Sequence, residues 1–95
     1  MTLEPNETQL IGQWIEDQGQ LRKDATCERI EWLTSQYLRK VALSPQWGAW
    51  EILFQDPSDM RYWEQTYPHG GMHGGGPPAL KQISNSEAES KYPGI

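Results

Sequence analysis

Cysteine is almost absent from this sequence of 95 residues, and so are long apolar runs and the pattern of a secretion signal. Cys27 is the only cysteine, so no disulfide can form within the chain. No apolar run approaches the length of a membrane-spanning helix, so we expect no membrane association. The first ten residues, MTLEPNETQL, lack the basic and apolar regions of a secretion signal, and we expect a cytoplasmic protein. The length predicts one domain over residues 1–95, with 1–8 as a flexible N-terminal segment.

Basic residues are also scarce, with 8 Lys and Arg against 13 Asp and Glu and a net charge of −5. They occur at most in adjacent pairs, Arg22-Lys23 and Arg39-Lys40, whereas phosphate binding needs clustered cations. We therefore expect no nucleic-acid partner. The acidic balance suits a basic protein partner, or it serves solubility, and composition alone favours solubility. Five Trp and four Tyr supply enough apolar area to predict a folded domain despite a hydrophobic fraction of only 36%.

The first half of the chain predicts a hairpin followed by a helix. Leu10, Ile11, Trp14 and Ile15 are compatible with strands, and Asp17-Gln18-Gly19 is a turn signal. Asp24 is a good N-cap for a helix. The sequence does not decide where this helix ends. Residues 37–43 either continue it or form a strand with Tyr37, Val41 and Leu43 on one side, and we favour the strand. The apolar positions at helical spacing are Cys27, Ile30, Leu33, Thr34, Tyr37, Leu38 and Val41.

The second half predicts a β-hairpin over residues 50–67. Trp50, Ile52 and Phe54 alternate with polar or opposite-facing residues, the turn is Asp56-Pro57-Ser58-Asp59, and RYWEQTYP returns as the partner strand. The glycine-rich residues 68–78 form a loop, and 80–83 a short edge strand. Ser84 and Glu87 form a capping box that opens a last helix, with Ala88 and Tyr92 toward the core.

These elements predict an α+β fold: a small antiparallel sheet of about four to six strands, one main helix packed on a face, and a short C-terminal helix. The glycine-rich loop is expected to be ordered and to pack on the sheet. Replacing Gly74, Gly75 and Gly76 together with alanine should then destabilise the fold, by about 1–3 kcal/mol per strained position.

Few residues suggest chemistry. His69 and His73 lie four apart, but the glycines between them exclude a shared helix face, and no third ligand is near in sequence, so we expect no metal. Glu51 and Glu64 fall on paired strands and resemble an acid–base pair, or a solvated strand face. We expect Cys27 to be a core residue rather than a nucleophile. No cofactor motif is present, and we expect neither an enzyme nor a cofactor.

The stretches ERIEWL, WEILFQDPSDMRYWEQTYP and HGGGPPAL, followed by SEAESKY, resemble one known family over residues 10–92. It is the immunity protein 27 family of bacterial polymorphic toxin systems. A glycine in the DP turn is expected of this family, and this sequence has Met60 there. The resemblance implies an immunity protein of toxin–antitoxin or contact-dependent inhibition systems. Such a protein binds a cognate toxin, for example a basic nuclease-type domain, and neutralises it by stoichiometric occlusion.

An adaptor without a toxin partner is the alternative, and a small metal-dependent enzyme using His69, His73 and the hairpin carboxylates is a third hypothesis. Acidic and aromatic residues near turns and on the hairpin are the candidates for partner binding. Because Asp56 and Asp59 lie in a turn, reversing both charges is expected to leave folding intact. The candidate residues are Glu16, Asp17, Trp32, Glu51, Asp56, Asp59, Tyr62 and Glu64.

Overall fold

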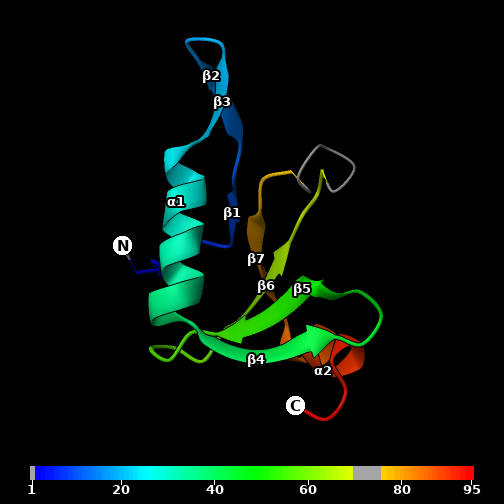
Figure 1. Cartoon of the computed structure of the whole chain (residues 1–95). Coiled ribbons are helices and arrows are strands. Elements are labelled where there is room, and N and C mark those ends of the chain that lie inside the picture. The colour runs from blue at the N-terminus through cyan, green and yellow to red at the C-terminus, as the bar shows by residue number, and fades with distance from the viewer. Residues whose placement is uncertain (1, 70–75) are drawn as a thin grey trace.

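The computed structural model describes residues 2–69 and 76–95, and its centre is an antiparallel sheet (Figure 1). The strand order in this sheet is β1-β7-β6-β5-β4, and β2 and β3 form a separate two-stranded hairpin that projects from the body. The elements are β1 (Gln9–Ile11), β2 (Trp14–Asp17), β3 (Gln20–Lys23), α1 (Ala25–Trp32), η1 (Leu33–Tyr37), β4 (Arg39–Ser44), β5 (Gly48–Gln55), β6 (Tyr62–Thr66), β7 (Ala79–Ile83) and α2 (Asn85–Lys91).

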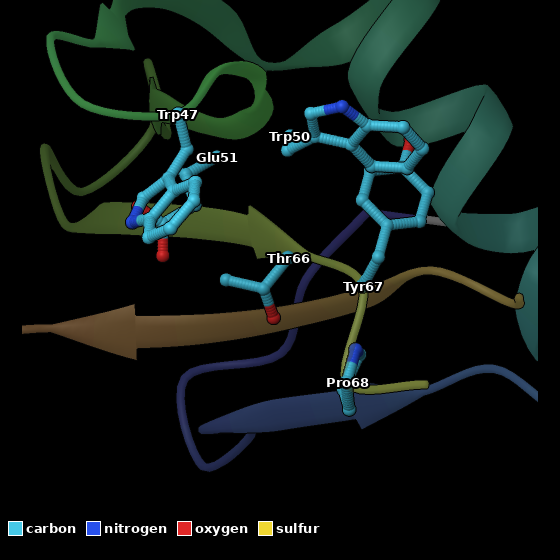
Figure 2. A pocket seen from close by; sticks show the side chains of 6 residues that line it. All are labelled: Trp47, Trp50, Glu51, Thr66, Tyr67 and Pro68. Carbon is cyan, nitrogen blue, oxygen red and sulfur yellow. The ribbon is translucent and has the colours of Figure 1, made fainter. Parts of the chain in front are cut away.

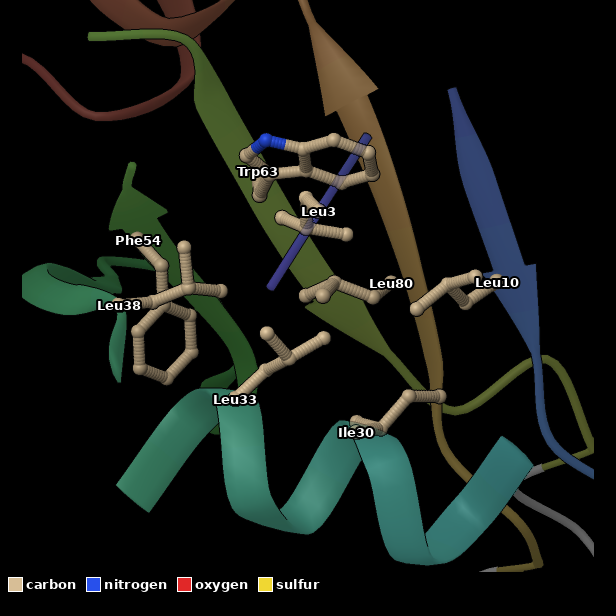
Figure 3. Close-up of a cluster of buried hydrophobic side chains, with 8 residues drawn as sticks. All are labelled: Leu3, Leu10, Ile30, Leu33, Leu38, Phe54, Trp63 and Leu80. Carbon is tan, nitrogen blue, oxygen red and sulfur yellow. The ribbon is translucent and has the colours of Figure 1, made fainter. Parts of the chain in front are cut away.

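The two helices lie on opposite faces of the sheet. Ile30 and Leu33 of the α1–η1 segment point at the first buried cluster (Figure 3), whose sheet members are Leu10, Phe54, Trp63 and Leu80. Ala88 of α2 and Tyr92, the residue that caps its C-terminus, pack on Leu53 and Ile83 from the other side. The predicted α+β class, with one main helix and a short C-terminal helix, is confirmed.

Alternation along β5 explains how a single strand serves both clusters. Phe54 is 1% exposed and faces α1, whereas Leu53 is fully buried on the α2 side. The predicted 50–67 hairpin is confirmed by a register that pairs Ile52 with Gln65 and Gln55 with Tyr62. Met60 in its turn has a φ of 66°, the left-handed conformation that glycine adopts without steric cost.

Helix α1 begins where the sequence predicts. The carboxylate of Asp24 accepts a hydrogen bond from the backbone N–H of Cys27 at 2.8 Å. The helix then widens into the π turn η1, and the Leu38 N–H reaches back to the Leu33 carbonyl at 2.7 Å before the chain enters β4. The strand favoured for residues 37–43 is therefore present, although Tyr37 belongs to η1.

Three details of the predicted strands are wrong. Val41 and Leu43 do not share a side, because a register shift between Lys40 and Ala42 turns Val41 toward the second cluster and leaves Leu43 half exposed. The strand at 79–83 is not at the edge, since β1 pairs with it on its outer side. Leu10 and Ile11 accordingly belong to the main sheet, and the hairpin with the Gln18-Gly19 turn begins at Trp14.

Residues 2–8, expected to be a flexible segment, contact the folded domain. Leu3 is 8% exposed and joins the first buried cluster. Glu7 accepts two hydrogen bonds from the Arg29 guanidinium, at 2.6 and 2.7 Å. Arg61 donates to the backbone carbonyls of Glu4 and Glu7. These contacts place the segment against α1 and the β5–β6 turn.

Candidate binding surface

The projecting hairpin carries Glu16 and Asp17, two of the predicted partner-binding residues. Both are exposed, and Asp17 accepts a hydrogen bond from Arg22 of the neighbouring strand at 2.7 Å. Ile15 and Leu21 on the same hairpin are also about half exposed or more, at 47% and 63%. This arm is accessible, and it projects away from the central sheet, whose strands β5 and β6 carry Glu51 and Glu64 (Figure 1).

The β5–β6 turn holds Asp56 and Asp59, and the structure separates their roles. Asp56 is 1% exposed and accepts from the Tyr37 hydroxyl and the Ser58 N–H, both at 2.8 Å. Asp59 is exposed. Local loss of solvent raises its pKa, but the hydrogen bonds from the Arg61 backbone and side chain outweigh that effect and lower the pKa. The expectation that reversing both charges spares folding overlooked the burial of Asp56. Reversal there would bury an unpartnered cation, so we now expect it to destabilise the fold.

Glu51 and Glu64 lie on the face of the sheet that α2 covers. Glu64 pairs with Leu53 in the register, so the two glutamates are diagonal neighbours rather than directly opposed. Lys91 Nζ lies 2.8 Å from a carboxylate oxygen of each, and the Tyr92 hydroxyl donates to Glu64 at 2.6 Å. One ammonium between two carboxylates leaves this cluster with a net charge of −1.

The electrostatics of this cluster tie α2 to the sheet. Burial opposes the charge on Lys91, but its hydrogen bonds to Glu51 and Glu64 outweigh that effect and raise its pKa. Burial, and then the hydrogen bond to Glu64, raise the pKa of Tyr92. Glu64 is only 6% exposed. The pair suggested for acid–base chemistry is therefore engaged in holding the C-terminal helix, and Glu64 is closed to a partner.

Trp32 and Tyr62, the aromatic candidates, are both half-buried. The Trp32 ring stacks on Tyr37 with centroids 6.0 Å apart and an interplanar angle of 11°. Tyr62 packs against the second buried cluster on the opposite face. The eight predicted residues thus lie at separate places on the molecule and do not form one surface.

A surface that the sequence reasoning missed lies at the end of the sheet where β5 begins. It is a cavity of about 380 Å³, which we call the aromatic pocket, lined by Trp47, Trp50, Glu51, Thr66, Tyr67 and Pro68. Figure 2 shows Trp47 beside Glu51 and Trp50 beside Tyr67, with Thr66 between the two pairs. The Trp50 and Tyr67 rings meet edge to face, with centroids 5.3 Å apart.

Local structure positions these side chains. The Ser44 hydroxyl accepts hydrogen bonds from the backbone N–H groups of Gln46 and Trp47, and Trp47 in turn accepts from the Trp50 N–H at 3.2 Å. Trp47 and Trp50 nevertheless remain 55% and 54% exposed. Strand alternation correctly predicts that Trp50 lies on the same side as Ile52 and Phe54. It does not predict that helix α1 leaves this end of the sheet uncovered.

Cys27 and the histidines complete the chemistry-bearing residues. Cys27 is 1% exposed and burial raises its pKa, which confirms its place in the interior. His69 is exposed, and His73 lies outside the described residues. Among residues 2–69 and 76–95, no three His, Cys, Asp or Glu side chains gather as a metal site would require. Neither helix in these same ranges is long and apolar enough to cross a bilayer.

These features define a small α+β domain with an aromatic surface left open at one end of its sheet. The family model described as Immunity protein 27 matches residues 16–84, which run from β2 through β7. The chain therefore belongs to the immunity protein 27 family. Neither the search of curated proteins nor the search of solved structures gives a match. Membership implies that the partner is a cognate toxin.

Proposed function

We propose that this protein binds the catalytic domain of a cognate polymorphic toxin in the cytoplasm and neutralises it by stoichiometric occlusion. The observation that carries the proposal is the family match over residues 16–84, which covers the whole central sheet except β1. An immunity protein acts by occupying its toxin, so it needs an accessible surface and no chemistry of its own.

The exposed surface supports such a role. Large apolar side chains at least half exposed gather around the β4–β5 connection: Leu43, Trp47 and Trp50, at 50%, 55% and 54%. Exposed tryptophans are typical of the few residues that dominate a protein interface, because each removes a large area from water when it is covered. A partner that covers this end of the sheet would gain that area.

The net charge of −5 supports a basic toxin domain, of the kind that acts on nucleic acid. Opposite net charges attract at long range and accelerate the encounter of two proteins without requiring any one acidic patch. This matters here because the predicted acidic candidates are dispersed over the molecule. Association is therefore expected to slow as salt rises, while dissociation changes less.

The direct experiment pairs the protein with the toxin carboxy-terminal domain encoded beside its gene. We expect co-expression to restore growth, a 1:1 complex in calorimetry, and loss of toxin activity that is complete at one equivalent. A non-cognate toxin domain of similar charge is the matched control. Failure to bind the neighbouring domain, or inhibition that persists at substoichiometric amounts, would contradict occlusion and favour an adaptor or a catalytic role.

A further inference from the structure

The aromatic pocket combines features that are costly to leave open in a free protein. The indole side chains of Trp47 and Trp50 line it, and both residues are more than half exposed. The Oε2 atom of Glu51 accepts from Lys91 Nζ, whereas its Oε1 atom is buried and has no hydrogen-bond partner among the residues that the structure describes. An unsatisfied carboxylate oxygen beside exposed aromatic faces points to a missing donor.

We propose, on the basis of the proposed function, that this pocket receives an arginine side chain of the toxin domain. A guanidinium is planar and stacks on aromatic faces, and it carries several N–H donors that suit a carboxylate. The Trp47 ring beside Glu51 provides the face, Glu51 provides the acceptor, and Trp50 and Tyr67 line the other side of the same cavity (Figure 2). The cluster of Glu51, Glu64 and Lys91 keeps a net charge of −1 and therefore favours a cation.

Other ligand chemistries fit the pocket less well. Among residues 2–69 and 76–95, none that lines it is Lys, Arg or His, so an anion such as a phosphate finds no opposite charge there. A purely apolar side chain would cover the tryptophans but leave the Oε1 atom of Glu51 without a donor, which is unfavourable. A cationic side chain satisfies both the rings and the carboxylate.

Trp47 is the aromatic residue that lies beside the Glu51 carboxylate (Figure 2). It belongs to the β4–β5 turn rather than to the core. Because more than half of this side chain is exposed, it has few contacts that oppose a rotamer change. Binding is therefore expected to move the Trp47 ring more than the Trp50 ring, which contacts Tyr67 edge to face.

The first test uses small probes on the intact protein. N-acetyl-arginine methylamide is titrated while the indole N–H signals of the five tryptophans are followed by NMR, and the neutral, similarly shaped N-acetyl-citrulline methylamide is the control ligand. We expect the signals of Trp47 and Trp50 to shift, with the arginine probe binding roughly 2–5-fold more tightly than citrulline. Equal binding of the two probes, or shifts confined to Trp14, Trp32 and Trp63, would overturn the proposal.

Variants separate charge from shape. Glu51→Gln keeps the outline of the side chain and should remove the preference for arginine, whereas Glu89→Gln makes the same charge change at an exposed position of α2 and should preserve it. An unaltered preference in Glu51→Gln would contradict the role of the carboxylate. Thermal unfolding of each variant shows whether the fold is retained.

The second test uses the neighbouring toxin domain. We expect Trp47→Ala and Trp50→Ala each to weaken binding about tenfold or more, and Leu21→Ala, which truncates another exposed apolar side chain, to have a smaller effect. If the wild-type protein binds the toxin and both tryptophan variants bind equally well, the pocket assignment fails while the proposed function stands. If no toxin binding occurs but the arginine probe is preferred, the proposed function fails instead.

Discussion

Replacing Gly76 with alanine probes the one glycine of the 68–78 loop that the structure describes in full and that a side chain would disturb in two ways. Its φ is +74°, and a Cβ built on it would lie 2.4 Å from the backbone carbonyl oxygen of His69. Gly74 and Gly75, the other members of the predicted triple replacement, lie outside the described residues. Gly76 therefore carries the test of whether this loop is fixed by close backbone approach.

Two other glycines separate the two effects. Gly48 has a φ of +58° with nothing within 4 Å of its Cβ position, so alanine there measures the conformational cost alone. Gly12 has no positive φ, but its Cβ would lie 2.6 Å from both the Cys27 sulfur and the Pro78 carbonyl oxygen, so alanine there measures crowding alone. Each of the three variants adds one methyl group to the wild-type protein.

The left-handed conformation costs an L-residue about 1–2 kcal/mol, and the stiffer unfolded chain of alanine returns about 0.4–1 kcal/mol. Gly48→Ala should therefore lose about 1 kcal/mol of unfolding free energy. Crowding in a packed region costs about 1–3 kcal/mol, and after the same return from the unfolded chain Gly12→Ala should lose about 0.5–2 kcal/mol. Gly76→Ala combines both and should lose about 2–4 kcal/mol.

Urea denaturation followed by tryptophan fluorescence measures all three variants on one scale. A loss of 1 kcal/mol corresponds to a fall in Tm of about 4–8 °C for a domain of this size, so thermal unfolding gives a second reading. The reasoning is refuted if Gly76→Ala loses no more stability than Gly48→Ala, because the approach of the His69 carbonyl would then have no energetic consequence.

Two further predictions concern the turn and the N-terminal segment. Met60→Gly should stabilise the fold by about 0.5–1 kcal/mol, because Met60 is 57% exposed and its φ of 66° favours glycine; a lower midpoint in urea would show that the methionine side chain contributes packing. Glu7 has its pKa lowered from 4.5 to about 2, chiefly by its hydrogen bonds from Arg29. The stability from this pair is therefore complete above pH 4.5 and lost as the pH falls toward 2, by about 1–2 kcal/mol after solvent screening, and Glu7→Gln should flatten that part of the pH–stability curve.

The local signals of the sequence predicted the elements that local chemistry controls. Asp24 caps α1, Ser84 and Glu87 form the capping box of α2, and Gln18-Gly19 makes the hairpin turn through two positive φ angles. The β5–β6 hairpin followed from alternation and a proline turn. Each of these depends on residues a few positions apart, so one sequence suffices.

Long-range pairing could not be predicted in the same way. β1 has only three residues, and its pairing with β7 joins Gln9 to Lys81, more than seventy positions along the chain. Nothing in such a short strand specifies its partner, since many apolar triplets would fit. The bulge in β4 has no signal in the sequence either, yet the bulge decides that Val41 packs against the second buried cluster and Leu43 does not.

The same limit explains why acidity was a poor guide to the surface. A carboxylate at a turn or on a strand is expected to be solvated, but Asp56 and Glu64 are buried, and there Tyr37 and Tyr92 donate hydrogen bonds to them. Their partners lie 19 and 28 positions away, beyond any local pattern. Trp50 is the opposite case. An aromatic residue in a strand is expected to be buried, but neither helix of the described residues covers Trp50 and it is exposed. The exposure of a tryptophan and the burial of a carboxylate are both decided by tertiary packing. The aromatic pocket combines exposed tryptophans with the buried Glu51 Oε1, so substitutions there are the most direct test of how this protein recognises its partner.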